Sequence, residues 1–238
     1  NKKMMDLEET LDLDLGMIKN YIDVDLLPAE TTTTHIYETQ VPVDVKRYIS
    51  NVKNSVNINS HLLKLTSSNN IIRPVTEMNE VYCSKHRGTE SKAGSDAVFE
   101  TEHIDGPFGM VPKLTLFRCI ITICNQTGTE TVIGENKYRM KKGHFVAIDY
   151  NRDLHYIKVA DGYDGRFGAK RYVLKLHYIS YPMGCPMFVV RIFEFCNINY
   201  NRLARKAFLY TLEPKTLPQK ALSFVINKTT KMWSTFFR

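Results

Sequence analysis

Between residues 79 and 178 the chain reads as a series of short strands, and this region constrains the fold more than any other. Its segments are rich in β-branched and aromatic residues and are separated by Gly, Asn or Asp turns. Several short strands at such a spacing are typical of a β-sandwich or a barrel. The expected strands cover residues 79–84, 97–102, 114–124, 131–133, 137–140, 144–149, 154–159 and 172–178.

Both ends of the chain have a different pattern. The first thirty residues mix Asp and Glu with Leu, Met and Ile, which predicts short acidic helices, and a second helical candidate covers residues 41–52. An Asn- and Ser-rich passage over residues 54–70 is expected to mix turns with short pieces. After Pro182 the pattern becomes helical over residues 188–210, and a last helix begins near Thr216.

Together these patterns predict an α+β protein in three parts. Residues 1–70 form an N-terminal helical or irregular extension, residues 71–182 form the β core, and residues 183–238 form a helical extension packed on that core. With 238 residues and a hydrophobic content of 43%, the chain is long enough to bury a substantial core.

Charge and cysteine content narrow the function classes. The net charge of +7 is spread along the chain without a polybasic block, so it permits an anionic partner but does not demand one. The five cysteines are an odd number without a C-x-x-C pair, which argues against a disulfide framework and a structural zinc site. Reduced thiols, together with the lack of a signal-peptide or membrane-spanning pattern, predict an intracellular and cytoplasmic location.

Two imidazoles and one carboxylate stand at positions that suit a metal site. His103 and Asp105 come at the end of one expected strand, and His155 is at the head of a later strand. Because residues two apart in a strand point to the same side, His103 and Asp105 can both face inward. Two His and one carboxylate that leave three positions open are the ligands of non-haem iron(II) oxygenases. We therefore expect His103, Asp105 and His155 to bind iron(II) and to form the catalytic centre.

The open positions of such a site would take a bidentate 2-oxo acid and then O₂. The distal carboxylate of this co-substrate needs a cation on a rigid element, because a guanidinium grips a carboxylate through two parallel hydrogen bonds. Arg171, which begins the strand after His155, is the first choice, and Lys175 shares its face. Arg118 and Arg166 are further candidates, although Arg118 in its apolar strand also suits a structural ion pair.

The order of these elements resembles the iron(II)/2-oxoglutarate-dependent oxygenases, whose double-stranded β-helix, a cupin-like jelly roll, carries an HxD…H…R/K signature. The resemblance covers about residues 81–182. The strand over residues 143–149 followed by His155 is similar to the strand, turn and distal histidine of that family. Residues 171–182 are similar to the closing strand of aspartyl/asparaginyl- and prolyl-hydroxylase-like members. The spacing from His155 to Arg171 is longer than usual for the family, which leaves Arg166 in the Gly-rich insert as a rival.

The resemblance implies an enzyme that hydroxylates an unactivated C–H bond with 2-oxoglutarate and O₂ and releases succinate and CO₂. Iron(II) would be its metal, with ascorbate as a further candidate cofactor. A protein side chain or a small metabolite is favoured as the substrate. Nucleic acid is less favoured, because no basic stripe is interleaved with exposed aromatic residues.

Two alternatives stay open at the level of sequence. In the first, the chain is a non-catalytic β-barrel module whose His and Asp residues are structural and which binds a partner through its apolar C-terminal region. In the second, it is a cupin-like sensor that binds a metal but no 2-oxoglutarate, which requires Arg171 to point away from the pocket. The positions of the three candidate ligands and of Arg171 discriminate these readings.

Overall fold

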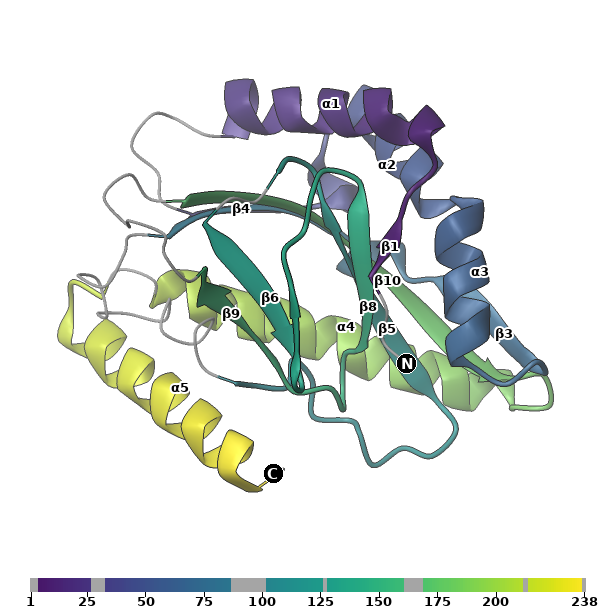
Figure 1. Ribbon diagram of the computed structural model, residues 1–238. Coiled ribbons are helices and arrows are strands. Elements are labelled where there is room, and N and C mark those ends of the chain that lie inside the picture. Colours follow the sequence, from purple (N-terminus) through teal and green to yellow (C-terminus); the bar gives the residue numbers. More distant parts are fainter. Residues whose placement is uncertain are drawn as a thin grey trace.

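The computed structural model describes residues 4–26, 33–86, 102–125, 128–160, 169–211 and 214–236. Within these ranges the chain combines helices with two antiparallel sheets, so the expected α+β class is confirmed (Figure 1). The strands are β1 (Met5–Asp6), β2 (Thr33–Tyr37), β3 (Asn70–Pro74), β4 (Glu80–His86), β5 (Thr115–Thr122), β6 (Thr129–Ile133), β7 (Asn136–Tyr138), β8 (His144–Asp149), β9 (His155–Val159) and β10 (Ala169–Pro182).

The helices lie at both ends of the chain. Four short turns of 3₁₀ or π type accompany the α-helices: η1 (Glu9–Leu11), η2 (Ile22–Leu26), η3 (Glu38–Gln40) and η4 (Thr76–Met78). The α-helices are α1 (Asp12–Tyr21), α2 (Val43–Lys53), α3 (Val56–Leu65), α4 (Met187–Tyr210) and α5 (Leu217–Phe236).

The larger sheet has the strand order β1-β8-β5-β10-β4-β2, and its long central strand β10 also pairs with β3. Along one edge, β10 pairs first with β4 and then with β3, and along the other edge it pairs with β5. The smaller sheet has the order β7-β6-β9. His103 extends it by an antiparallel bridge to His155, with backbone N···O distances of 3.0 Å in both directions.

The two-residue period of the strands separates two hydrophobic cores. In β10, Tyr172, Leu174 and Leu176 pack on the outer face of the larger sheet against α1, α2 and α3, which cover that face (Figure 1). Val173, between them in the sequence, belongs instead to a core between the two sheets, with Ile120 and other side chains. The inward row of β10 continues with polar groups, since Arg171 and Lys175 line a cavity on the same side.

Helix α4 packs against one end of the larger sheet. Its Val190 and Phe193 join a third hydrophobic cluster with residues of β5, β10 and η4. Helix α5 contacts α4, and Ile226 of α5 reaches the same cavity as Arg171 and Lys175. None of the helices in the described ranges has the length and apolar character needed to cross a membrane.

Two local expectations were wrong. Residues 56–65 form the regular helix α3 rather than turns and short pieces, because Ser55 caps the helix by accepting a hydrogen bond from the Ile58 backbone N–H. Ile58 and Leu62, four residues apart on the inner face of α3, are fully buried. Residues 33–37, where no strand was expected, form β2, an edge strand of the larger sheet. Of the strand expected over residues 97–102, only the last residue lies within the described ranges.

Candidate metal centre

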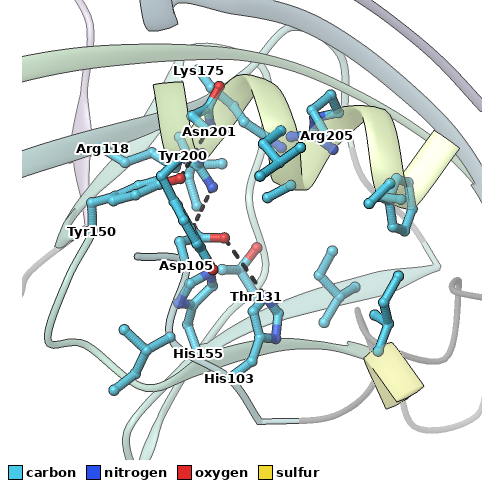
Figure 2. A pocket seen from close by; sticks show the side chains of 18 of the residues that line it. His103, Asp105, Arg118, Thr131, Tyr150, His155, Lys175, Tyr200, Asn201 and Arg205 are labelled. Carbon is cyan, nitrogen blue, oxygen red and sulfur yellow. Dashed lines mark hydrogen bonds and ion pairs between the residues drawn. The ribbon is translucent and has the colours of Figure 1, made fainter. Parts of the chain in front are cut away.

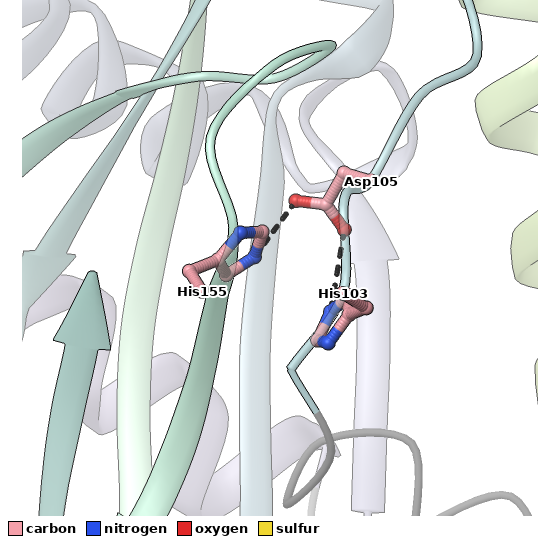
Figure 3. Close-up of side chains that lie close together, drawn as sticks. All are labelled: His103, Asp105 and His155. Atoms are coloured by element: carbon pink, nitrogen blue, oxygen red, sulfur yellow. Dashed lines mark ion pairs between the residues drawn. The ribbon is translucent and has the colours of Figure 1, made fainter. Parts of the chain in front are cut away.

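The smaller sheet brings the three expected metal ligands together. His103 and His155 are bridge partners, so their side chains start from neighbouring backbone positions, and Asp105 lies two residues beyond His103. The three side chains point toward one another (Figure 3). Their exposed fractions are 11% for His103, 17% for Asp105 and 8% for His155, so the group is shielded from bulk water.

The separations of the donor atoms suit a divalent metal. Nε2 of His155 is 3.2 Å from Oδ2 of Asp105, and Nε2 of His103 is 3.8 Å from Oδ1. One donor atom from each residue lies within 4.8 Å of the other two. Ligands about 2.1 Å from one ion and at right angles to each other are about 3 Å apart, close to the shorter of these distances. A metal held here would be bound by two nitrogen atoms and one oxygen atom.

A backbone contact fixes the orientation of His155. Its Nδ1 is 3.0 Å from the carbonyl oxygen of Asp153. Because a carbonyl oxygen can only accept a hydrogen bond, Nδ1 donates to it, and Nε2 is the ring nitrogen that faces Asp105 and that a metal would use. Metal-binding histidines use such a contact to fix their tautomer and ring orientation.

The electrostatic surroundings keep Asp105 ionised. Burial alone would raise the pKa of the Asp105 carboxyl, but the charge of Arg118 and contacts with His155 and His103 outweigh burial and hold it well below its usual value. Nη1 of Arg118 donates a hydrogen bond to Oδ2 of Asp105. Asp105 is therefore a carboxylate, the form that binds a metal.

Arg118 is itself held by two neighbours in the interior. Its Nε donates to Nε2 of His177 at 2.9 Å, and its guanidinium lies 4.6 Å from the centre of the Tyr150 ring. Burial and the charge of Arg118 hold the pKa of His177 well below its usual value, so His177 is a neutral acceptor. The Tyr150 hydroxyl in turn accepts a hydrogen bond of 3.1 Å from Asn201 on α4. Through Arg118, this chain of contacts fixes the orientation of the Asp105 carboxylate.

A cavity of about 340 Å³ opens in front of the three ligands (Figure 2). Its size is at the lower end of the range for small-molecule sites. Ile120 and Ile157 contribute apolar wall between the sheets, while α4 contributes Tyr200, Asn201 and Arg205 on another side.

Arg171 lines this cavity without a carboxylate partner among the described residues. It is 2% exposed, its Nη2 is 3.4 Å from the Thr131 hydroxyl, and its Nε has no hydrogen-bond partner. Burial lowers the pKa of Arg171 to about 10. Thr131 pairs with Ile157, which is two residues from His155 along β9, so Thr131 lies about 7 Å further along the cavity wall. A small dicarboxylate could span from the three ligands to Arg171.

The other three cations expected to bind the co-substrate differ from Arg171. Lys175 also lines the cavity, but its Nζ is 2.9 Å from Oε1 of the fully buried Glu80. Arg118 lines it as well and is paired with Asp105. Arg166 lies outside the described residues.

Several residues at the site had not been expected from the sequence. Thr131 could have been found, because it is on the inward face of a strand that the pattern predicted. Glu80 also begins a strand, yet nothing in the sequence indicates that it meets Lys175 and Arg205. Arg205 is on a helix whose sequence shows no link to the β core, and the same holds for Asn201.

No family model matches this chain, and no curated protein shows significant similarity to it. The case for a function therefore depends on the geometry and chemistry of the site.

Proposed function

We propose that the chain is an iron(II)- and 2-oxoglutarate-dependent oxygenase. The observation that carries this proposal is one shared cavity. Two imidazoles and a carboxylate converge on one of its walls, and the buried guanidinium of Arg171, with no carboxylate partner among the described residues, lies further along. A metal that binds a 2-oxo acid and a cation that binds its distal carboxylate are the two parts that such an enzyme needs.

The strand orders support a double-stranded β-helix as the framework. From β4 onward the described chain alternates between the two sheets except at the hairpin of β6 and β7. The larger sheet takes β4, β5, β8 and β10, and the smaller one takes the His103 bridge, β6, β7 and β9. Such alternation, with the site enclosed between the sheets, is what a jelly-roll core requires. Residues 71–182 would form this core, with helical extensions before and after it.

In this proposal each residue has a defined role. His103, Asp105 and His155 hold iron(II), and Arg171 with Thr131 binds the distal carboxylate of 2-oxoglutarate. Bound iron(II) with 2-oxoglutarate and O₂ supplies the chemistry that converts a C–H bond to C–OH, with succinate and CO₂ as co-products.

The protein also sets the properties of the site. Arg118 keeps Asp105 ionised and oriented, so the ligand set is ready before the metal binds. Ile120 and Ile157 limit the access of water to the region between the ligands and Arg171. A protein side chain or a small metabolite is the proposed substrate.

Metal binding and 2-oxoglutarate turnover test the proposal. The wild-type protein should bind manganese(II) or iron(II) at one site and should release succinate from 2-oxoglutarate in air. His103→Ala and Asp105→Ala should lose both properties. His144→Ala serves as the control, because His144 pairs with Asp6 outside the cavity. A wild-type protein that binds no divalent metal would rule the proposal out.

The contact between Arg118 and Asp105 favours one rival reading. The guanidinium already compensates the carboxylate without a metal, as it would in a non-catalytic module that binds small anions in this cavity. The two readings differ in the titration, since the rival predicts that 2-oxoglutarate binds equally well with and without manganese(II).

A further inference from the structure

Helix α4 brings a second group of charges into the cavity, opposite the candidate metal ligands. Figure 2 shows Arg205 and Asn201 on the helix across the cavity from His103 and His155. Nη2 of Arg205 is 2.8 and 3.0 Å from the two carboxylate oxygens of Glu80, which Lys175 also contacts. Its Nε is buried and has no hydrogen-bond partner among the residues that the structure describes. Arg205 therefore keeps a donor that none of the described residues accepts.

The charges around the cavity do not balance. Four cations line it: Arg118, Arg171, Lys175 and Arg205. Among the described residues, two carboxylates contact them. Asp105 pairs with Arg118, and Glu80 pairs with Lys175 and Arg205 and more distantly, at 3.9 Å, with Arg118. Because burial lowers the pKa of Lys175 to about 7, this lysine is only partly charged near neutral pH, and the four basic groups exceed the two carboxylates by at most two positive charges in a buried space. Such an excess is unfavourable unless a ligand compensates it.

The two uncompensated charges lie at different places. One belongs to Arg171, and the other is shared by the partly charged Lys175 and by Arg205, for which Glu80 is the one carboxylate partner in the part of the chain that the structure describes. Arg171 and Lys175 are four residues apart on the same face of β10, so their Cα atoms are separated by about 13 Å. The distal carboxylate of 2-oxoglutarate can neutralise the first charge, which leaves the second for another ligand.

The walls next to this second position are aromatic and apolar. Nζ of Lys175 is 4.3 Å from the centre of the Tyr82 ring, and the Arg205 guanidinium is 5.6 Å from the same ring and 5.7 Å from that of Phe208. Ala204, Ala207 and Phe208 line the cavity along α4. Charged donors beside an apolar wall suit a ligand with an anionic end and an apolar body.

We propose that the substrate carries an anionic group, a carboxylate or a phosphate, which binds between Arg205 and Lys175 with its apolar part against Ala204, Ala207 and Phe208. The reaction on this substrate rests on the proposed function, but the anion site rests on its own residues. The C–H bond to be hydroxylated then lies on the apolar part, between the anionic end and the metal.

Matched acids and amides test this site in the full-length wild-type protein. With manganese(II) and 2-oxoglutarate bound, calorimetry should show that aliphatic carboxylates or alkyl phosphates bind at least 10-fold more tightly than the neutral amides of the same length. With iron(II), the same acids should stimulate succinate release where the amides do not. A preference for carboxylate or for phosphate identifies the anionic group. Equal binding of acids and amides overturns the proposal.

Variants on α4 test the residue that carries the site. Arg205→Gln should weaken binding of the preferred acid by about 10- to 150-fold, the effect of losing hydrogen bonds to a charged group. Arg205→Lys should restore part of it. Arg202→Gln removes a charge from an exposed position of the same helix and should change the affinity less than 2-fold. If Arg205→Gln folds and binds the acid as wild type does, the assignment is wrong.

The outcomes separate this proposal from the proposed function. Binding of metal and 2-oxoglutarate without any preference for acids refutes the anion site and leaves the oxygenase standing. Preference for acids in a protein that binds no metal refutes the oxygenase and leaves the anion site standing. The comparison of acids and amides uses the wild-type protein, so it tests the anion site even if a variant fails to fold.

Discussion

Replacing Arg171 by Met tests whether the cavity keeps an unpaired charge for an anionic ligand. The guanidinium is 2% exposed and, within the described ranges, has one long hydrogen-bond contact, to the Thr131 hydroxyl at 3.4 Å. A charge buried in this way destabilises the protein unless a ligand compensates it. We therefore expect Arg171→Met to have opposite effects: the variant without ligands should be more stable than wild type, and it should bind 2-oxoglutarate far more weakly.

The magnitude follows from the pKa of the side chain. Burial lowers the pKa of Arg171 from 12.5 to about 10, and 2.5 units at 1.36 kcal/mol each correspond to about 3 kcal/mol. At pH 7 Arg171 is charged in both states, so this is the free energy by which folding disfavours the charge. Met removes that penalty but fills less of the space, and we expect the unfolding free energy to rise by about 1–3 kcal/mol. Losing the partner of a buried carboxylate costs about 2–5 kcal/mol, so the affinity for 2-oxoglutarate should fall by about 30-fold or more.

Urea denaturation followed by circular dichroism measures the first effect, and calorimetry in the presence of manganese(II) measures the second. Arg191→Met is the control, because Arg191 is exposed on α4, where a substitution should change the unfolding free energy by about 0.5 kcal/mol or less. An Arg171→Met variant that is less stable than wild type by about 1 kcal/mol would show that the fold already satisfies the guanidinium. Unchanged affinity for 2-oxoglutarate would show that Arg171 does not bind it.

Three further predictions follow from the site and its support. Gly106→Ala should lower the unfolding free energy by about 1–3 kcal/mol and weaken manganese(II) binding, because its Cβ would lie 2.5 Å from the Tyr150 ring and displace Asp105; denaturation and metal titration measure the two effects. Glu80→Gln should cost about 3–5 kcal/mol at pH 7 in urea denaturation, since it leaves Arg205 buried without its carboxylate. Burial raises the pKa of Glu80, but its cationic neighbours hold it well below 4.5, so this carboxylate stabilises the fold above about pH 4.5 and the difference from Glu80→Gln should shrink at lower pH. Manganese(II) at 1,000 times its dissociation constant should stabilise wild type by about 4 kcal/mol in denaturation and should not stabilise Asp105→Ala.

The sequence predicted the parts of the fold that depend on local pattern. Runs rich in β-branched and aromatic residues, set between turn residues, identified the strands that became β5 and β8, and both strands are buried along almost their whole length. The same period placed His103 and Asp105 on one side of an extended segment. The helix α3 was missed since its Asn and Ser residues favour turns, whereas Ser55 acts as a cap and the buried Ile58 and Leu62 decide the conformation.

The partners of the buried charges could not be predicted, because they come from distant parts of the chain. Glu80 contacts Arg205, which is 125 residues away in the sequence, and no local pattern links β4 to α4. The partner of Arg118 could not be predicted either. From the sequence, this arginine in an apolar strand could equally bind an anionic ligand or form a structural ion pair, and the structure shows the ion pair with Asp105.

The ion pairs in the cavity also indicate which cation would bind an anionic ligand. Arg118, Lys175 and Arg171 all face inward from strands of the larger sheet, and inward direction is all that a strand period can establish. A cation that already contacts a carboxylate gains less from a second anion, because part of its charge is compensated. Arg118 has Asp105 and Lys175 has Glu80, while Arg171 has only a hydroxyl among the described residues. It follows that an anion entering the cavity gains most at Arg171, and next at the place where Lys175 must share its carboxylate with a second cation.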